Sequence, residues 1–132
     1  HVALSHSDTD FPLFRLADVK LMLAEASLKV GDQATALDNI NEIRARAYGN
    51  SNHNFSTVTL DDVLNERSKE LYWECTRRTD LIRFNKFTGS DLVWSFKGGT
   101  TDGTAVDEFR SLYPLPTYDI VNNPNLSQNN GY

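Results

Sequence analysis

The residues most suited to chemistry are the acidic and basic side chains interspersed between Thr59 and Phe87. This charged row consists of Glu66, Arg67, Glu70, Glu74, Arg77 and Arg78. Its glutamates recur every four residues, which places them one turn apart if the segment is helical. A row of this kind is an active site, a structural ion-pair network or a solvated helix face.

Catalysis is the most demanding of these interpretations. Glycoside cleavage needs two carboxyl groups roughly 5 to 9 Å apart, and carboxylates one helical turn apart nearly meet that distance. The available carboxyl groups are those of Asp61, Asp62, Glu66, Glu70 and Glu74. However, each glutamate has an arginine or lysine within reach along the helix, and such a partner keeps a carboxylate ionised, unlike a general acid. We therefore expect no catalytic residue and no enzyme activity.

A structural network explains the charged row better. One side of the expected helix carries Arg67, Leu71, Cys75 and Arg78, so two arginines share a stripe that should be buried. An unpaired buried charge costs several kcal/mol, so these arginines need carboxylate partners. Glu74 and Arg78 have the favourable i,i+4 order for such a pair. We predict that the six residues form a structural ion-pair network, with a solvated face as the alternative.

The composition of the 132 residues limits the classes of protein to which the chain can belong. The net charge of −5 argues against nucleic-acid binding, which needs clustered lysine and arginine. No apolar run approaches the roughly 20 residues of a membrane-spanning helix. Cys75 is the single cysteine, and its helical position favours a small core residue over a catalytic thiol. His1, His6, Asp8 and Asp10 lack the spacing of a standard metal site, so we expect neither metal nor cofactor.

Two helices are predicted before the charged row. The first runs from Leu16 to Val30 and carries an apolar stripe that we expect to face inward. This stripe consists of Leu16, Val19, Leu23, Ala26 and Val30, and Leu21 and Leu28 widen it. Gly31 is a typical helix stop. Asp32 then caps a second helix that ends near Tyr48, before Gly49.

Two antiparallel helices with so short a turn form a hairpin, which resembles a tetratricopeptide unit. Ala24, Gly31 and Ala36 lie where that pattern needs small residues for a close helix crossing. One such hairpin cannot bury both of its faces. It therefore docks on the following helices, on another chain or on a part of the protein outside this sequence. The predicted fold is mostly α, an α-α superhelix with this hairpin, a long charged helix and an irregular carboxy-terminal wrap.

The long helix is expected to begin at Thr59, which forms a capping box with Asp62, and to break near Thr79. Residues 88–111 follow it without periodicity and are rich in glycine. Trp94 and Phe96 in this loop are the candidate ligand-binding residues, because sugars stack on exposed aromatic faces. The alternative is that both fill a local core, where aromatic side chains are usually found. A short hairpin over residues 94–99 is also compatible with the sequence.

Four segments together resemble the carboxy-terminal part of the SusD/RagB family, whose members are glycan-binding lipoproteins on the outer membrane of Gram-negative gut bacteria. These segments are Phe14–Val19 with Leu23–Ala26, Ala36–Arg44, Asn65–Phe84, and Tyr113–Pro116 with Asn123–Tyr132. One position departs from the family. The family often has glycine after the glutamate equivalent to Glu74, where this chain has Cys75.

The resemblance implies non-catalytic capture of an oligosaccharide or polysaccharide, which is passed to a SusC-type TonB-dependent transporter in the outer membrane. It further implies that residues 1–132 are one carboxy-terminal helical domain of a longer, surface-exposed lipoprotein. The membrane attachment would then be a lipid anchor outside this sequence. The alternative function is a tetratricopeptide-like protein-interaction module. Retardation of the protein by polysaccharides in affinity gels would favour the glycan interpretation.

Overall fold

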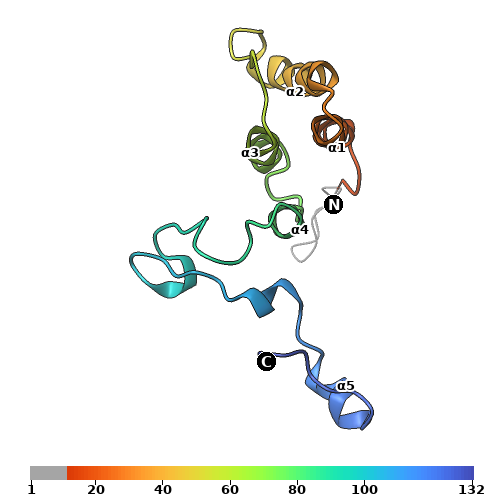
Figure 1. Ribbon diagram of the computed structural model, residues 1–132, viewed down its shortest axis with the longest axis vertical. Coiled ribbons are helices and arrows are strands. Elements are labelled where there is room, and N and C mark those ends of the chain that lie inside the picture. Colours follow the sequence, from red (N-terminus) through yellow and green to blue (C-terminus); the bar gives the residue numbers. More distant parts are fainter. Residues whose placement is uncertain (1–11) are drawn as a thin grey trace, which may run out of the picture. The chain divides into compact units, whose positions relative to one another are not determined.

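The computed structural model describes residues 12–132, which fall into two compact units, residues 12–77 and residues 78–132 (Figure 1). Helices are the main regular elements of both units, and the described residues contain one isolated β-bridge, between Gly89 and Val106. The prediction of a mostly α fold is therefore confirmed. Among residues 12–132, no helix combines the length and the apolar character needed to cross a membrane.

The first unit opens with a helical hairpin formed by α1 (Leu16–Lys29) and α2 (Gln33–Tyr48). The carboxylate of Asp32 accepts a hydrogen bond from the backbone N–H of Thr35 at 3.1 Å, which caps α2 as predicted. Hydrogen bonds from Thr35 also lower the pKa of Asp32 below its ordinary value. Gly49 ends α2 in the left-handed conformation, with φ of 71°. Local signals thus predicted both ends of α2.

The core of the first unit lies between the hairpin and α3 (Leu60–Glu70). It consists of Leu21, Ala24, Ala36, Ile40, Ile43, Val58, Val63 and Leu71. The predicted inward stripe of α1 was wrong, because Leu16, Val19, Leu23 and Val30 are exposed. Both sides of α1 are apolar, and α2 and α3 pack on the side that carries Leu21 and the small Ala24.

The predicted long helix is two shorter helices, α3 and α4 (Arg77–Arg83). Its start is as predicted, because Thr59 Oγ1 accepts the N–H of Asp62 at 3.2 Å and the Asp62 carboxylate accepts the N–H of Thr59 at 2.9 Å. The break lies at residues 71–76 instead of near Thr79. Trp73 and Cys75 have φ angles of 66° and 60°, and this left-handed backbone cannot continue a right-handed helix.

Cys75 is exposed, so its predicted place in the core was wrong. The prediction assumed a helical register that is lost once the chain turns at Leu71. The left-handed φ at Cys75 also gives a physical reason for glycine at this position, since glycine adopts such angles without steric cost.

Replacing Cys75 by glycine is expected to raise the free energy of unfolding by about 0.5–1 kcal/mol. Glycine relieves the steric strain of the left-handed backbone. The greater conformational entropy of glycine in the unfolded chain offsets part of this gain. Urea denaturation followed by circular dichroism measures it. Cys75→Ala is the control, because alanine keeps the strain and should give no gain; equal stabilisation by both variants would contradict this account.

The second unit begins within α4 and continues as an irregular wrap with three further short helices, η1 (Lys97–Gly99), η2 (Glu108–Ser111) and α5 (Thr117–Asn122). A hairpin over residues 94–99 is not formed, because η1 occupies part of that stretch. Arg78 organises the wrap: its guanidinium donates to the carbonyls of Arg110 and Ser111 at 2.8 and 3.2 Å and lies 4.0 Å from the ring centroid of Tyr113.

The asparagine-rich tail is held in the second unit by side-chain amides. The Gln128 amide accepts from the N–H of Leu115 at 2.8 Å and donates to its carbonyl at 2.9 Å, as a neighbouring strand would. The hydroxyl of Tyr132 donates to the carbonyl of Leu112 at 2.8 Å. Gly131 packs against the ring of Phe109, where a β-carbon would lie 2.4 Å from the nearest ring atom. The tail is therefore an ordered part of this unit.

Candidate functional site

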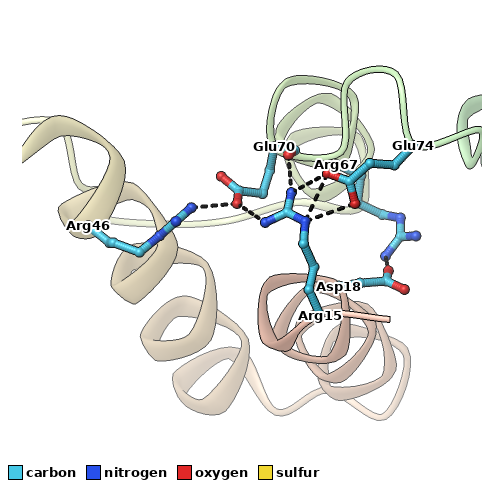
Figure 2. Close-up of polar contacts among 6 residues, drawn as sticks. All are labelled: Arg15, Asp18, Arg46, Arg67, Glu70 and Glu74. Carbon is cyan, nitrogen blue, oxygen red and sulfur yellow. Dashed lines mark hydrogen bonds and ion pairs between the residues drawn. The ribbon is translucent and has the colours of Figure 1, made fainter. Parts of the chain in front are cut away.

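Two glutamates of the charged row, Glu70 and Glu74, lie where α3 and the following turn meet the hairpin, and both contact Arg15 (Figure 2). Arg15 Nε is 2.8 Å from each carboxylate oxygen of Glu74. Its Nη1 is 2.6 Å from Glu70 Oε1, and its Nη2 donates to the Glu70 carbonyl. Arg46 of α2 donates to the same Glu70 carboxylate. One arginine thus joins the start of α1 to the end of α3 and to the turn.

The two glutamates keep Arg15 charged. The hydrogen bond to Glu74 raises the pKa of Arg15 above its ordinary value, partial burial opposes this, and Glu70 adds to the increase. Since an arginine already titrates far above neutral pH, the cluster keeps its cation at every pH at which the protein is expected to be folded.

A second ion pair is buried between α2 and α3. Arg44 Nη1 lies 2.6 Å from Glu66 Oε2, and both side chains are almost fully buried. Arg44 Nε donates to the carbonyl of His53 at 2.8 Å, and its guanidinium lies 4.0 Å from the ring centroid of Phe55. These contacts use the charge and the planar face of the guanidinium together.

A third pair joins α3 to α1, where Arg67 Nη1 is 2.8 Å from Asp18 Oδ1 (Figure 2). Within the first unit, α3 and its turn are therefore tied to α1 by Arg67 and Arg15, and to α2 by Glu66 and Glu70.

Four members of the charged row, namely Glu66, Arg67, Glu70 and Glu74, pair with residues that the sequence interpretation did not include. These partners are Arg15, Asp18, Arg44 and Arg46. They lie 22 to 59 positions away along the chain, so helical spacing gave no signal for them.

The last two members of the row contact main-chain carbonyls. Arg77 donates to the carbonyl of Leu64 at 3.1 Å, and Arg78 donates within the second unit as described above. The predicted i,i+4 pair of Glu74 with Arg78 assumed that both residues lie in one continuous helix. This assumption was wrong, because Glu74 lies in the turn before α4. A structural role for the six residues remains our prediction.

The geometry of the carboxylates favours scaffolding over acid–base chemistry. Glu66, Glu70 and Glu74 each accept hydrogen bonds from arginine, and these contacts join α3 and the turn after it to the hairpin. Across residues 12–132 there is no group of three or more histidine, cysteine or acidic side chains that could hold a metal ion. The four residues considered above as metal ligands lie outside the described residues; they are His1, His6, Asp8 and Asp10.

The candidate ligand-binding aromatics, Trp94 and Phe96, are exposed in the second unit. Phe96 is 72% exposed and has a left-handed φ of 67°, while Trp94 is 57% exposed. The ammonium of Lys97 lies 4.7 Å from the centroid of the Trp94 ring and also donates to the carbonyl of Leu92. Gly103 allows close packing here, because a β-carbon would lie 2.2 Å from the Trp94 carbonyl. Phe96 is thus the more open of the two rings.

A second pair of exposed aromatics, Tyr72 and Trp73, was not identified from the sequence. Both lie in the turn after α3, with Trp73 82% exposed, and their ring centroids are 6.0 Å apart at 42°. A pocket of about 610 Å³ lies beside them, lined also by Ser68, Leu71 and Arg77. The sequence carries no glycine or proline near the turn, so the usual signal for such a feature was missing.

These observations define a class of protein: a helical scaffold, fastened by ion pairs between its helices, that ends in an irregular wrap. The sequence pattern of the SusD family matches residues 2–132. The chain therefore belongs to the SusD family, as the resemblance implied.

Individual relatives agree with this assignment. The chain is 45% identical to the starch-binding protein SusD of Bacteroides thetaiotaomicron over 128 residues, which are 97% of this chain and 22% of that protein. It is 34% identical to the SusD-like protein P25 of Formosa agariphila, across 97% of this chain and 26% of that one. A solved SusD superfamily protein from Parabacteroides distasonis superposes with a TM-score of 0.76 at 31% identity, over 97% of this chain and 28% of its own. The chain thus spans about a quarter of the length of these relatives.

Proposed function

We propose that this chain is the carboxy-terminal domain of a non-catalytic glycan-binding protein that serves an outer-membrane uptake system. The longer protein is anchored to the cell surface by a lipid and hands oligosaccharides to a TonB-dependent transporter of the SusC type. The observation that carries this proposal is the SusD family match over residues 2–132, together with 45% identity to a starch-binding protein.

The site geometry is consistent with this role. The carboxylates of the charged row are engaged by arginine, so we assign them to the scaffold. Four exposed aromatic side chains, Tyr72, Trp73, Trp94 and Phe96, offer apolar faces on which a sugar ring can stack. Starch is the first ligand to test, because the relative with 45% identity is a starch-binding protein.

Affinity electrophoresis in gels containing soluble starch, or plant and host polysaccharides, tests the binding. We expect at least one polysaccharide to retard the protein. The 132-residue chain and the longer polypeptide from the same gene should be run side by side. Failure of both to be retarded by any polysaccharide would overturn the glycan proposal and favour a protein-interaction module.

Removing the aromatic faces tests where the sugar is bound. If the loop of residues 88–111 contacts the sugar, Trp94→Ala and Phe96→Ala should each weaken binding by roughly fivefold or more, equivalent to about 1 kcal/mol. Isothermal titration with a maltooligosaccharide measures the change. Tyr118→Ala is the matched control, because Tyr118 is an exposed aromatic on α5. This variant should bind the sugar as strongly as the unmodified chain does.

The same titration separates the two aromatic pairs. Loss of binding in Trp73→Ala, with Trp94→Ala and Phe96→Ala unchanged, would move the contact to the turn after α3. Unchanged binding in all three variants would place the sugar elsewhere in the longer protein and remove Trp94 and Phe96 as ligand-binding residues.

A further inference from the structure

The loop of residues 89–106 in the second unit is closed by its own hydrogen bonds. At its base, Gly89 and Val106 form a bridge in which each N–H donates to the other's carbonyl, at 2.8 and 3.4 Å. Farther along the loop, the N–H of Thr104 donates to the carbonyl of Lys97 at 2.9 Å. The ends and the middle of the loop are therefore held together in the absence of a ligand.

Within this loop, Lys97 contacts both the backbone and the indole ring of Trp94. Its N–H donates to the Trp94 carbonyl at 3.1 Å. Its ammonium lies over the indole ring, 4.7 Å from the centroid, and donates to the carbonyl of Leu92. A cation at this distance is attracted by the ring of tryptophan, and the Leu92 carbonyl holds the ammonium in place. Lys97 therefore covers one face of the indole.

Gly103 is a second constraint on Trp94. It has a φ of 77°, and a β-carbon there would lie 2.2 Å from the Trp94 carbonyl and 2.7 Å from a methyl carbon of Val93. The backbone of Trp94 thus packs closely on a residue that has no side chain. Trp94 as a whole is nevertheless 57% exposed. Since the ammonium of Lys97 occupies one face of the ring, the opposite face is the one left for a ligand.

Holding an aromatic side chain in place before binding increases its affinity for a ligand. A mobile side chain loses rotamer freedom when a sugar stacks on it, and this loss of entropy weakens the complex. A ring that a neighbouring cation already holds has less freedom to lose. Lys97 can therefore raise the affinity of Trp94 for a sugar without contacting the sugar itself.

We propose that Lys97 is a positioning residue for sugar binding at Trp94. It holds the indole from one face and leaves the opposite face for the C–H surface of a sugar ring. The inference rests on the proposed glycan-binding function, and it adds to that function the residue that orients the ring and the face on which the sugar lies.

Fluorescence shows whether Lys97 holds the ring. Trp73→Phe leaves Trp94 as the only tryptophan of the chain. In this background, time-resolved anisotropy measures the motion of the indole relative to the protein. Lys97→Met removes the charge but keeps a long apolar side chain, whereas Lys97→Arg keeps a cation. Lys86→Met is the matched control, because the ammonium of Lys86 lies 3.6 Å from the carboxylate of Asp91. Circular dichroism confirms that each variant is folded.

Affinity electrophoresis measures the effect of the same substitutions on binding, in proteins that keep Trp73. The gels contain soluble starch, or plant and host polysaccharides, and the 132-residue chain and the longer polypeptide are both run. We expect Lys97→Met to increase the motion of the indole and to weaken polysaccharide binding by about threefold. Lys97→Arg should restore both properties, and Lys86→Met should change neither.

The outcomes separate the positioning role from the glycan function. Unchanged indole motion in Lys97→Met would overturn the proposal, because the ring would then be held by other groups. Retardation of the unmodified protein with equal retardation of Lys97→Met would also overturn it, as would a loss of binding that Lys97→Arg does not restore. Retardation of neither the chain nor the longer polypeptide by any polysaccharide would instead overturn the glycan function, and this role with it.

Discussion

Replacing Glu66 by alanine is expected to lower the free energy of unfolding of the first unit by about 3–5 kcal/mol. The reason is the burial of its partner: Arg44 is only 8% exposed, and its Nη1 lies 2.6 Å from the Glu66 carboxylate. Without that carboxylate, a cation would remain in the interior with only the His53 carbonyl and the aromatic rings to compensate it. Urea denaturation followed by circular dichroism gives the change.

Two variants show whether the loss comes from the unpaired charge. Arg44→Met combined with Glu66→Leu removes both charges and should recover most of the stability lost in Glu66→Ala. Lys69→Ala is the matched control, because Lys69 is exposed and 3.5 Å from the same carboxylate, and should cost less than about 1 kcal/mol. A loss in Glu66→Ala no larger than in Lys69→Ala would show that the buried pair does not stabilise the fold.

The second large effect is expected at Leu21, where substitution by alanine should cost about 2–5 kcal/mol. Leu21 is 0% exposed and lies in the core between α1, α2 and α3, so the shorter side chain leaves a cavity. The same denaturation experiment measures the loss.

Leu23→Ala in the 132-residue chain is the matched control for Leu21→Ala. It makes the same chemical change two residues along the same helix, but on the exposed side of α1, and should cost less than about 1 kcal/mol. The comparison also tests the orientation of α1. If Leu23→Ala proved the more damaging of the two, the stripe predicted from the sequence would be the buried one and the observed packing would be wrong.

Some features of this protein follow from short stretches of sequence alone. Asp32 and Gly49 delimit α2, and Thr59 with Asp62 begins α3, because capping requires only residues within three or four positions of the helix end. The family motifs are also short stretches of sequence, and together they identified the SusD family. The mostly α character is a sum of such local preferences.

The turn at residues 71–76 shows where local reasoning failed. Its left-handed residues are Trp73 and Cys75, which have no intrinsic preference for that backbone. The hydrogen bonds of Glu74 and Glu70 with Arg15 hold the turn against α1, although Arg15 is 59 positions from Glu74 in the chain. Contacts that bridge such a distance exist only once the helices are packed.

The sequence by itself determined that this chain is helical, where its first three helices begin, and that it belongs to the SusD family. Only the tertiary structure decided which apolar stripe of α1 is buried and which arginine pairs with each glutamate. The physical reason is the same in both cases. A helix with two apolar faces, or a charge with several possible partners, has more than one local solution, and the positions of the other helices select among them.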